Sequence, residues 1–191
     1  MSDCGKITAS IYQDCDNPIV GGTKDRLILM NLIDVESYTE ELLNPIIITA
    51  LTLVSGAVAY EIEGKNNSNR PLSELVRGAY SEAWAHQADF IAFKTDGATK
   101  KQVEYMAQGR MVAIIERNYK GSAGNSAFEV YGLDSGLIMT EGRSDLADAD
   151  TMGAFNIVLR SQETSLEKHL PRAFFDTSYA VTKAKVDALL V

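Results

Sequence analysis

The apolar residues of this chain fall into short runs that are separated by turn-forming residues. Residues 27–35 (LILMNLIDV) and 46–54 (IIITALTLV) are continuous runs of strand length, although a helix over 27–35 stays open because period alone does not exclude it. Residues 57–63 (AVAYEIE) alternate, with Val58, Tyr60 and Ile62 on one face. A Ser-Gly pair at 55 and 56 offers a two-residue turn, so the pattern predicts a β-hairpin over 46–63.

Further β-branched, aromatic or alternating runs predict more strands at residues 7–12, 80–94, 111–116, 127–133, 137–141 and 154–162. A turn at 134–136 separates two of them. Polar, glycine-rich or acidic stretches predict connections at residues 36–44, 64–78, 118–126 and 145–150. The stretch 64–78 is the longest irregular segment, and loops of this length in compact domains are usually functional or mobile.

Three signals agree on a helix over residues 99–108. Thr99 and Gln102 match a capping box at its start. An apolar face follows at Val103, Met106 and Ala107. Gly109 fits the position after the helix, where left-handed geometry favours glycine. A second, short helix is expected within residues 177–190, with Thr182 as its cap.

Many short strands with turn punctuation and one firm helix predict a mainly β (α+β) fold. We expect a β-sandwich or small barrel with one flanking helix near residues 99–108 and a long loop near 64–78. The 191 residues are enough for a sizeable core, so one domain is the first expectation and two small domains are the alternative.

Composition narrows the function classes. The formal net charge is -8, and an acidic surface repels phosphate, which disfavours nucleic-acid binding across a broad basic face and binding to anionic membranes. DNA that passes an acidic wall without adhering to it remains compatible. The start MSDCGKITAS lacks the pattern of a signal peptide, and the most apolar stretch is too short and polar for a transmembrane helix, so we expect a soluble protein made without Sec export.

The two cysteines, Cys4 and Cys15, are too few for a disulfide framework. Two free or buried thiols are the favoured interpretation, and a disulfide within the N-terminal segment is the alternative.

A search for catalytic or ligand-binding motifs finds little chemistry. His86 lies within an apolar strand, which favours a structural or interface role, and His169 beside Lys168 is expected at the surface. Neither a G-x-S-x-G motif nor a phosphate-binding glycine loop occurs. The acidic run 148–153 begins like a calcium loop, but Leu159 stands where the closing glutamate is needed. We therefore expect no enzyme activity, no metal and no cofactor.

The order of hairpin 46–63, long loop 64–78, strand 87–94, helix 99–108 and strand 111–116 resembles the major tail tube proteins of long-tailed phages. That superfamily includes the type VI secretion tube. The stretch AFEVYGLDSGLIMTEGRSDLADADTMGAFNIVLRSQE is similar to the last strands of those proteins. The resemblance spans about residues 30–165 and implies a subunit of stacked hexameric rings around a channel for DNA.

The resemblance also implies partners and sites. The subunit would bind copies of itself in the virion tail, after assembly in the host cytoplasm, and would meet tape-measure, baseplate and tail-terminator proteins, with no membrane contact. The long loop would reach a neighbouring subunit or ring through Lys65, Asn66, Asn67, Ser68, Asn69, Arg70, Pro71 and Leu72. Glu61 and Glu63 are candidates for the acidic lumen. Segments 1–26 and 164–191 are candidates for inter-subunit arms of a single tail-tube-like domain.

Two other classes remain as alternatives. One is another virion structural protein, such as a capsid decoration or tail-completion protein. The other is a ligand-binding β-sandwich module, for which the single Trp offers little support.

Overall fold

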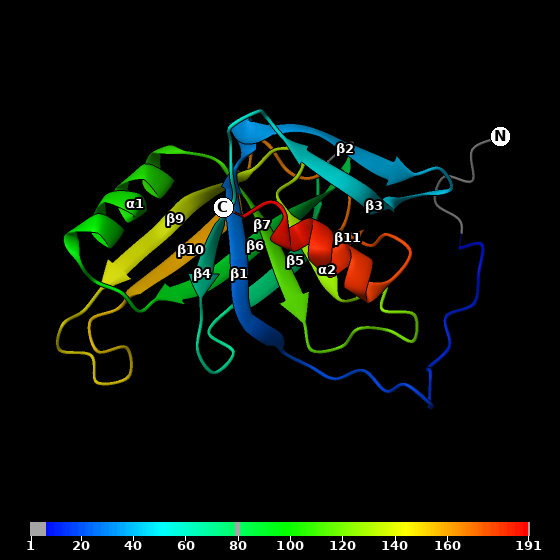
Figure 1. Cartoon of the computed structure of the whole chain (residues 1–191), viewed down its shortest axis with the longest axis horizontal. Helices are drawn as coiled ribbons and strands as arrows, with labels where there is room; N and C mark the ends of the chain where they lie inside the picture. Colours follow the sequence, from blue (N-terminus) through cyan, green and yellow to red (C-terminus); the bar gives the residue numbers. More distant parts are fainter. Residues whose placement is uncertain (1–6, 79–80, 191) are drawn as a thin grey trace.

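A computed structural model describes residues 7–78 and 81–190 (Figure 1). The fold is mainly β, with one large mixed sheet and two α-helices, so the predicted fold class is confirmed. In chain order the elements are β1 (Thr23–Asn31), a 3-10 turn (Leu32–Asp34), β2 (Val35–Glu41), β3 (Asn44–Leu53), β4 (Tyr60–Glu63), β5 (Arg70–Arg77), β6 (Glu82–Ala92), α1 (Gly97–Gln108), β7 (Met111–Arg117), β8 (Phe128–Tyr131), β9 (Leu137–Ser144), β10 (Phe155–Ser161), β11 (Arg172–Phe174) and α2 (Tyr179–Asp187).

The main path of the sheet runs β2-β3-β11-β8-β7-β9-β10-β6-β5, and β1 pairs with both β7 and β4. The pairs are antiparallel except for β11 beside β3. Within this order β2 and β5 are the two ends of the path, and β4 is an end of the branch through β1. These three strands therefore carry the open edges of the described sheet.

Strands β1 and β7 form the centre of the molecule and are covered on both faces. Alternate residues of each strand enter different hydrophobic cores: Ile28, Met30, Val112 and Ile114 the first, and Leu27, Leu29, Ala113 and Ile115 the second. This double burial explains why both strands read as continuous apolar runs instead of alternating ones. Full burial of each of the larger side chains in this set, Ala113 excepted, contributes about 1.5–3 kcal/mol.

Different strands and helices cover the two cores. The first lies under β3, β11 and α2, where Phe174 and Val186 are fully buried. The second lies against β6 and β10, around Phe90 and Leu159. Helix α1 packs beside β9, and its Val103 and Met106 reach the second core, whereas Ala107 of the predicted apolar face is exposed (Figure 1).

Helix α1 is confirmed and ends at Gln108 as predicted, but its predicted start is wrong. It begins one turn earlier, because Asp96 is the N-cap and its carboxylate accepts from the Thr99 N–H at 2.8 Å. Aspartate caps at least as well as threonine, so the upstream residue adds a turn to the helix. Gly109 is the C-cap with a φ of -103°, so no left-handed residue ends the helix.

The expected C-terminal helix is also present as α2, with Ser178 as N-cap instead of Thr182. Thr182 lies inside the helix, fully buried, and its hydroxyl donates to the Ser178 carbonyl at 2.9 Å. Together with β11, this helix ties the end of the chain into the first core. The described part of segment 164–191 therefore packs on its own fold, and its role as an inter-subunit arm stays a prediction.

The predicted hairpin over 46–63 is wrong in its pairing. β3 pairs with β2 and β11, whereas β4 pairs with β1, so 46–63 is no hairpin. The chain between them instead bonds to the C-terminal segment, where the Ala59 N–H donates to the Leu189 carbonyl at 2.7 Å. β8 and β9 are likewise separated by β7, which pairs with both of them. A strand goes where it buries most apolar surface, and a turn signal alone does not decide its partner.

The turn between β8 and β9 depends on Gly132. Its φ is +73°, and a Cβ there would lie 2.7 Å from the Leu137 side chain and 3.0 Å from the Met111 carbonyl oxygen. The sequence therefore needs glycine at this position for both conformation and space.

Three segments differ in type from the prediction. Residues 36–44, predicted as a connection, contain most of β2, whose Val35 and Tyr38 face the first core. Residues 7–12, predicted as a strand, lie outside every strand of the described chain. The predicted loop 64–78 is a short turn, 64–69, followed by β5. Edge strands such as β2 and β5 bury few side chains, which is why their sequences resemble loops.

Within residues 7–78 and 81–190, neither helix has the length and apolar character needed to cross a membrane.

Candidate functional site

The turn 64–69 carries most of the residues predicted to contact a neighbouring subunit. Asn66 and Asn67 adopt left-handed conformations, with φ of 52° and 58°, which asparagine tolerates better than most residues. Ser68 closes the turn, because its hydroxyl accepts from the Lys65 N–H at 2.9 Å. The turn is also tied to β1, since the Thr23 hydroxyl donates to the carbonyl of buried Asn69 at 2.8 Å. These hydrogen bonds fix the residues in a compact turn, so they do not form an extended loop.

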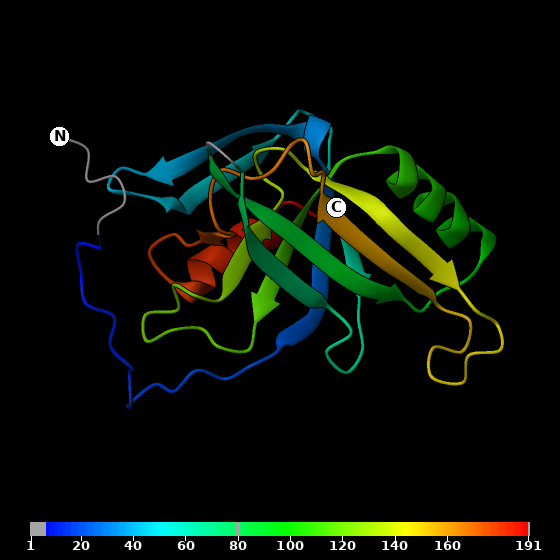
Figure 2. The same ribbon diagram turned by 180° about the vertical axis from the view of Figure 1, so that it is seen from behind.

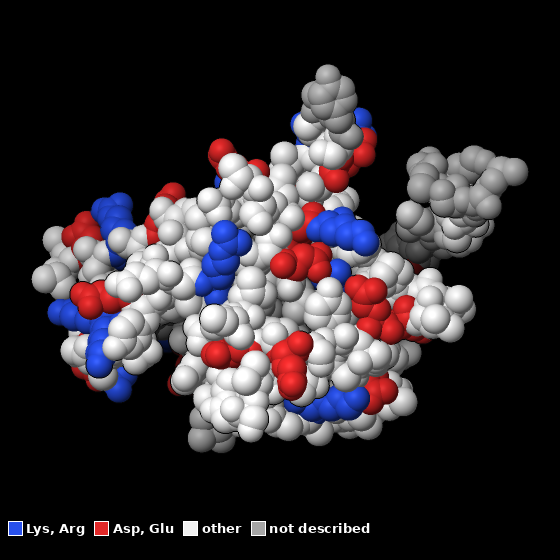
Figure 3. Space-filling view, turned by 90° about the horizontal axis from the view of Figure 1, so that it is seen from above, with Lys and Arg blue, Asp and Glu red and all other residues white. Residues whose placement is uncertain are grey.

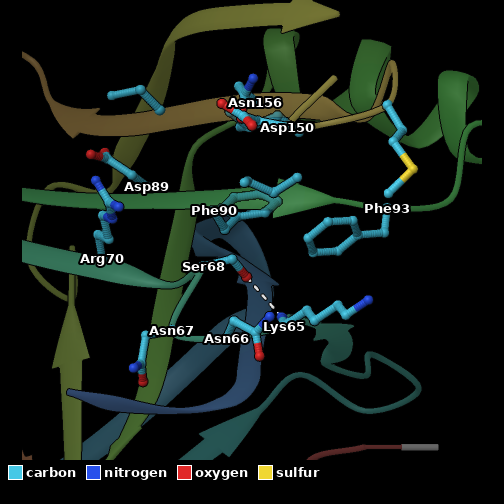
Figure 4. A pocket seen from close by; sticks show the side chains of 14 residues that line it. Lys65, Asn66, Asn67, Ser68, Arg70, Asp89, Phe90, Phe93, Asp150 and Asn156 are labelled. Carbon is cyan, nitrogen blue, oxygen red and sulfur yellow. Dashed lines mark hydrogen bonds between the residues drawn. The ribbon is translucent and has the colours of Figure 1, made fainter. Parts of the chain in front are cut away.

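The turn forms one wall of a hollow of about 670 Å³. Figure 4 shows Lys65, Asn66 and Ser68 on one side of it and Asp150 and Asn156 on the other. Its floor is β6 and β10, including Phe90, Ile157 and Val158. Residues 65–68 and Arg70 of the predicted set therefore meet at one site, whereas Pro71 and Leu72 continue into β5 outside it.

The charged groups of this hollow are Asp89, Asp150, Arg70 and Lys65. Burial raises the pKa of Asp89 above its ordinary value, and the Gln87 amide opposes that shift by donating to both carboxylate oxygens at 2.9 and 3.0 Å. Across the described residues, no three His, Cys, Asp or Glu side chains converge to hold a metal ion. The hollow can therefore receive polar or mixed groups through hydrogen bonds.

Glu61 and Glu63, the candidates for an acidic lumen, lie two residues apart on the open-edged β4, and both are exposed. Glu61 accepts from the Arg26 guanidinium at 2.9 Å, so part of its charge is compensated within the chain. The acidic loop 145–150 lies elsewhere, between β9 and β10.

Two segments project from the fold with uncovered apolar side chains. The first, the N-terminal arm (residues 7–22), runs outside the folded body in both views (Figures 1 and 2). Its Ile7, Ile11 and Tyr12 are 90%, 94% and 86% exposed. The second is the β2–β3 tip, where Leu42 and Leu43 are 96% and 92% exposed. Sequence reasoning missed the tip, because its two leucines were assigned to a polar connection.

One of the two cysteines, Cys15, lies in the arm. Cys15 is free and exposed, and Cys4 lies outside the described residues.

His86 is a buried structural histidine, as its apolar strand predicted. Its side chain is 2% exposed, Nδ1 accepts from the Gly132 N–H at 3.1 Å, and Nε2 donates to the His169 carbonyl at 3.0 Å. Burial lowers its pKa to about 4, so the ring is neutral near pH 7. His169 is partly buried, and the described contact to His86 uses its backbone.

A buried polar cluster near His86 was not predicted. Glu167 is fully buried, and its carboxylate accepts from the N–H groups of Asp134 and Ser135 at 2.8 and 2.9 Å. Arg172 is also buried and binds Asp134 at 2.9 Å and Glu40 at 3.4 Å. These bonds join the turn after β8 to the β2–β3 pair. The Arg-Ala-Phe-Phe sequence at 172–175 was the available signal, since it places a charge at the start of an apolar run.

Acidic and basic side chains are interspersed on the face shown in Figure 3. At the end with α1, the exposed Lys100 and Lys101 contribute basic charge. This face therefore carries charges of both signs and, among the residues that the structure describes, no large patch of a single sign.

Comparison of the chain with protein-family models, with curated proteins and with solved structures found no match.

Proposed function

We propose that this chain is a structural subunit that self-assembles into stacked hexameric rings and forms a phage tail tube, a conduit for DNA. The observation that carries the proposal is the exposure of large apolar side chains on the N-terminal arm and the β2–β3 tip. Exposed apolar groups gathered on projecting segments are typical of surfaces that become covered by a partner.

The sheet supports the same conclusion. Three strands, β2, β4 and β5, have an open edge, and pairing between copies satisfies such edges. A ring closes this pairing without leaving a free end. A projecting arm, a body with two cores and open strand edges are the parts that such a subunit needs.

The net charge of the chain supports the proposed role as a channel for DNA. A protein with a net charge of -8 repels phosphate overall, so DNA would move past it without being held. Glu61 and Glu63 on β4 stay the proposed lumen residues, and their exposure leaves them accessible to such a channel.

Negative-stain microscopy and light scattering of the purified full chain, over a concentration series, test the proposal. We expect rings with six-fold symmetry that stack into hollow tubes, and no retention of duplex DNA in a gel-shift assay at low salt. A strictly monomeric species at every concentration would overturn self-assembly. Solid filaments or rings of another symmetry would overturn the hexameric tube.

A further inference from the structure

We propose that residues 7–13 of one copy add a strand to the open edge of β5 in a second copy. The inference rests on the proposed self-assembly and deepens it, because it names the segment and the edge that meet. Such strand addition uses main-chain hydrogen bonds for affinity and alternate side chains for specificity.

The N-terminal arm has a strand pattern without a strand partner. In ITASIYQ, Ile7, Ala9 and Ile11 alternate with polar residues, which is typical of a half-buried strand. Yet the segment forms no strand in the described chain, and its large apolar side chains are exposed. The pattern ends at Asp14, whose carboxylate accepts from the N–H groups of Asp16 and Asn17, both at 3.1 Å. This turn limits the new strand to residues 7–13.

The β5 edge is ready to receive a strand. Its eight residues pair with β6 in an unbroken register. The backbone of Trp84 bonds to that of Glu167 at 2.8 and 2.9 Å, and the His86 N–H donates to the Ser161 hydroxyl at 3.0 Å, so both residues direct backbone groups away from β5.

In an antiparallel ladder, directly opposite residues share their orientation. The residues opposite Trp84 and His86 are Leu75 and Ser73, so their N–H and C=O groups point outward from the sheet. Pro71 fits this phase, because a proline in an edge strand sits where its missing N–H would face solvent. Ser73, Leu75 and Arg77 therefore present the backbone groups that an added strand needs.

The other two edges are less suitable. β2 has three register irregularities, and bulges of this kind blunt an edge against pairing. It also carries Glu36, Glu40 and Glu41. β4 has four residues, of which Glu61 and Glu63 are acidic.

The distribution of charged residues also favours β5 as the edge that receives the arm. The arm 7–22 contains Asp14 and Asp16 and neither lysine nor arginine, so it is acidic. β5 carries Arg70 and Arg77 at its two ends, while its Glu74 already accepts from Arg160 at 3.0 Å. No salt bridge of either terminal arginine occurs among the described residues. The acidic arm is thus attracted to β5, whereas β2 and β4 carry no basic residue that could attract it.

An antiparallel register fits both segments. Ile7 and Asp14 are seven positions apart, as are Arg70 and Arg77, so Asp14 can lie opposite Arg70. This register places Ile11 opposite Ser73. It also pairs Tyr12 with Leu72, which is 44% exposed on the outer edge. An aromatic-aliphatic pair of this kind contributes about 0.2–1 kcal/mol.

The occupant is a second copy because the arm leaves its own body. In both ribbon views the arm runs outside the outline of the fold, away from the β5–β6 pair (Figures 1 and 2). A docked arm would cover Ile7 and Ile11 against the neighbouring sheet.

Disulfide trapping in the full chain tests the contact. In a Cys4→Ser, Cys15→Ser background, one copy carries Ile11→Cys and a size tag, and the other carries Ser73→Cys. We expect a mixed disulfide at least tenfold above the yield with Ser37→Cys, an exposed position on the β2 edge. Equal yields from the two edges would overturn the proposal.

Charge reversal provides a second measurement. Asp14→Lys should reduce the mixed disulfide at least fivefold, and Arg70→Asp in the acceptor copy should restore it. An unchanged yield would refute the assigned register. If a chain carrying both Ile11→Cys and Ser73→Cys closes on itself at high dilution, the arm docks within one copy and the proposal is wrong.

These outcomes separate the inference from the proposed function. Hexameric rings without the mixed disulfide would leave the tube proposal standing and overturn the arm contact. A specific mixed disulfide in a protein that forms no rings would support the contact and overturn the tube.

Discussion

Replacing His86 with glutamine should remove a large part of the acid sensitivity of folding. The imidazole is buried, and both ring nitrogens have backbone partners, the Gly132 N–H and the His169 carbonyl. Protonation would place a proton on Nδ1 against the Gly132 N–H and a charge in a site that also faces Arg172. The pKa of His86 therefore falls from 6.5 to about 4, mainly through burial, although the His169 carbonyl and Asp134 oppose the shift.

The sign follows from the proton count. Between pH 4 and 6.5 the unfolded chain binds more protons at this residue than the folded chain does, so stability rises with pH across that window. The stabilisation is complete above pH 6.5 and is lost as the pH falls toward 4. A shift of this size corresponds to about 3 kcal/mol, because one pKa unit is about 1.4 kcal/mol.

Urea unfolding from pH 4 to 8, followed by the fluorescence of the single tryptophan, Trp84, measures this effect. We expect wild-type protein to lose about 3 kcal/mol more than His86→Gln between pH 6.5 and 4, since the carboxylates titrate alike in both. His169→Gln is the matched control, and because burial lowers the pKa of His169 as well, it should reduce the slope, but by less than His86→Gln does. Parallel pH profiles for wild type and His86→Gln would refute a buried neutral imidazole.

Three further changes test the fold and its surfaces. Gly132→Ala should lower the free energy of unfolding by about 2–4 kcal/mol, because it combines a positive φ with a clash, whereas Gly97→Ala, with open space around it, should change it by less than about 0.5 kcal/mol. Glu167→Gln should cost about 1–3 kcal/mol in urea unfolding, since a buried carboxylate that accepts two N–H groups becomes an amide that can accept only one of them, and a wild-type midpoint would contradict this assignment. Leu42→Ser with Leu43→Ser should leave the unfolding free energy within about 0.5 kcal/mol of wild type and reduce assembly in light scattering, so unchanged assembly would remove the tip from the proposed interface.

The central strands could be predicted from the sequence because burial on both faces requires an unbroken apolar run. β1 and β7 meet that requirement, and their positions were predicted within a few residues. Their partners could not be predicted in this way. The pattern of β4 suits any apolar neighbour, and pairing with β1 is decided by tertiary burial of Ile62 beside the second core.

The edge strands are the elements that the sequence pattern predicted least well. The sequence of β5 is RPLSELVR, which contains a proline and charged residues of both signs. All of its residues are half-buried or exposed. A strand that buries so little needs no alternation, so its sequence is indistinguishable from that of a loop. The candidate hollow was also predicted only in part. Its turn residues were identified from the sequence, but its opposite wall, with Asp150 and Asn156, comes from a distant part of the chain.

The proposed contact between the arm and β5 has a consequence for the shape of the assembly. Donor and acceptor are different patches, so each copy offers one of each, and the contact is heterologous. A heterologous contact continues from copy to copy until the rotation between subunits closes a ring, or else it grows as an open helix. A reciprocal exchange of arms between two copies would instead stop at a dimer. Hexameric rings therefore require that each arm reach a neighbour whose own arm points onward. The charge of β5 selects the edge that receives the arm, and the rotation between neighbouring copies decides whether the arms close a ring or exchange within a dimer.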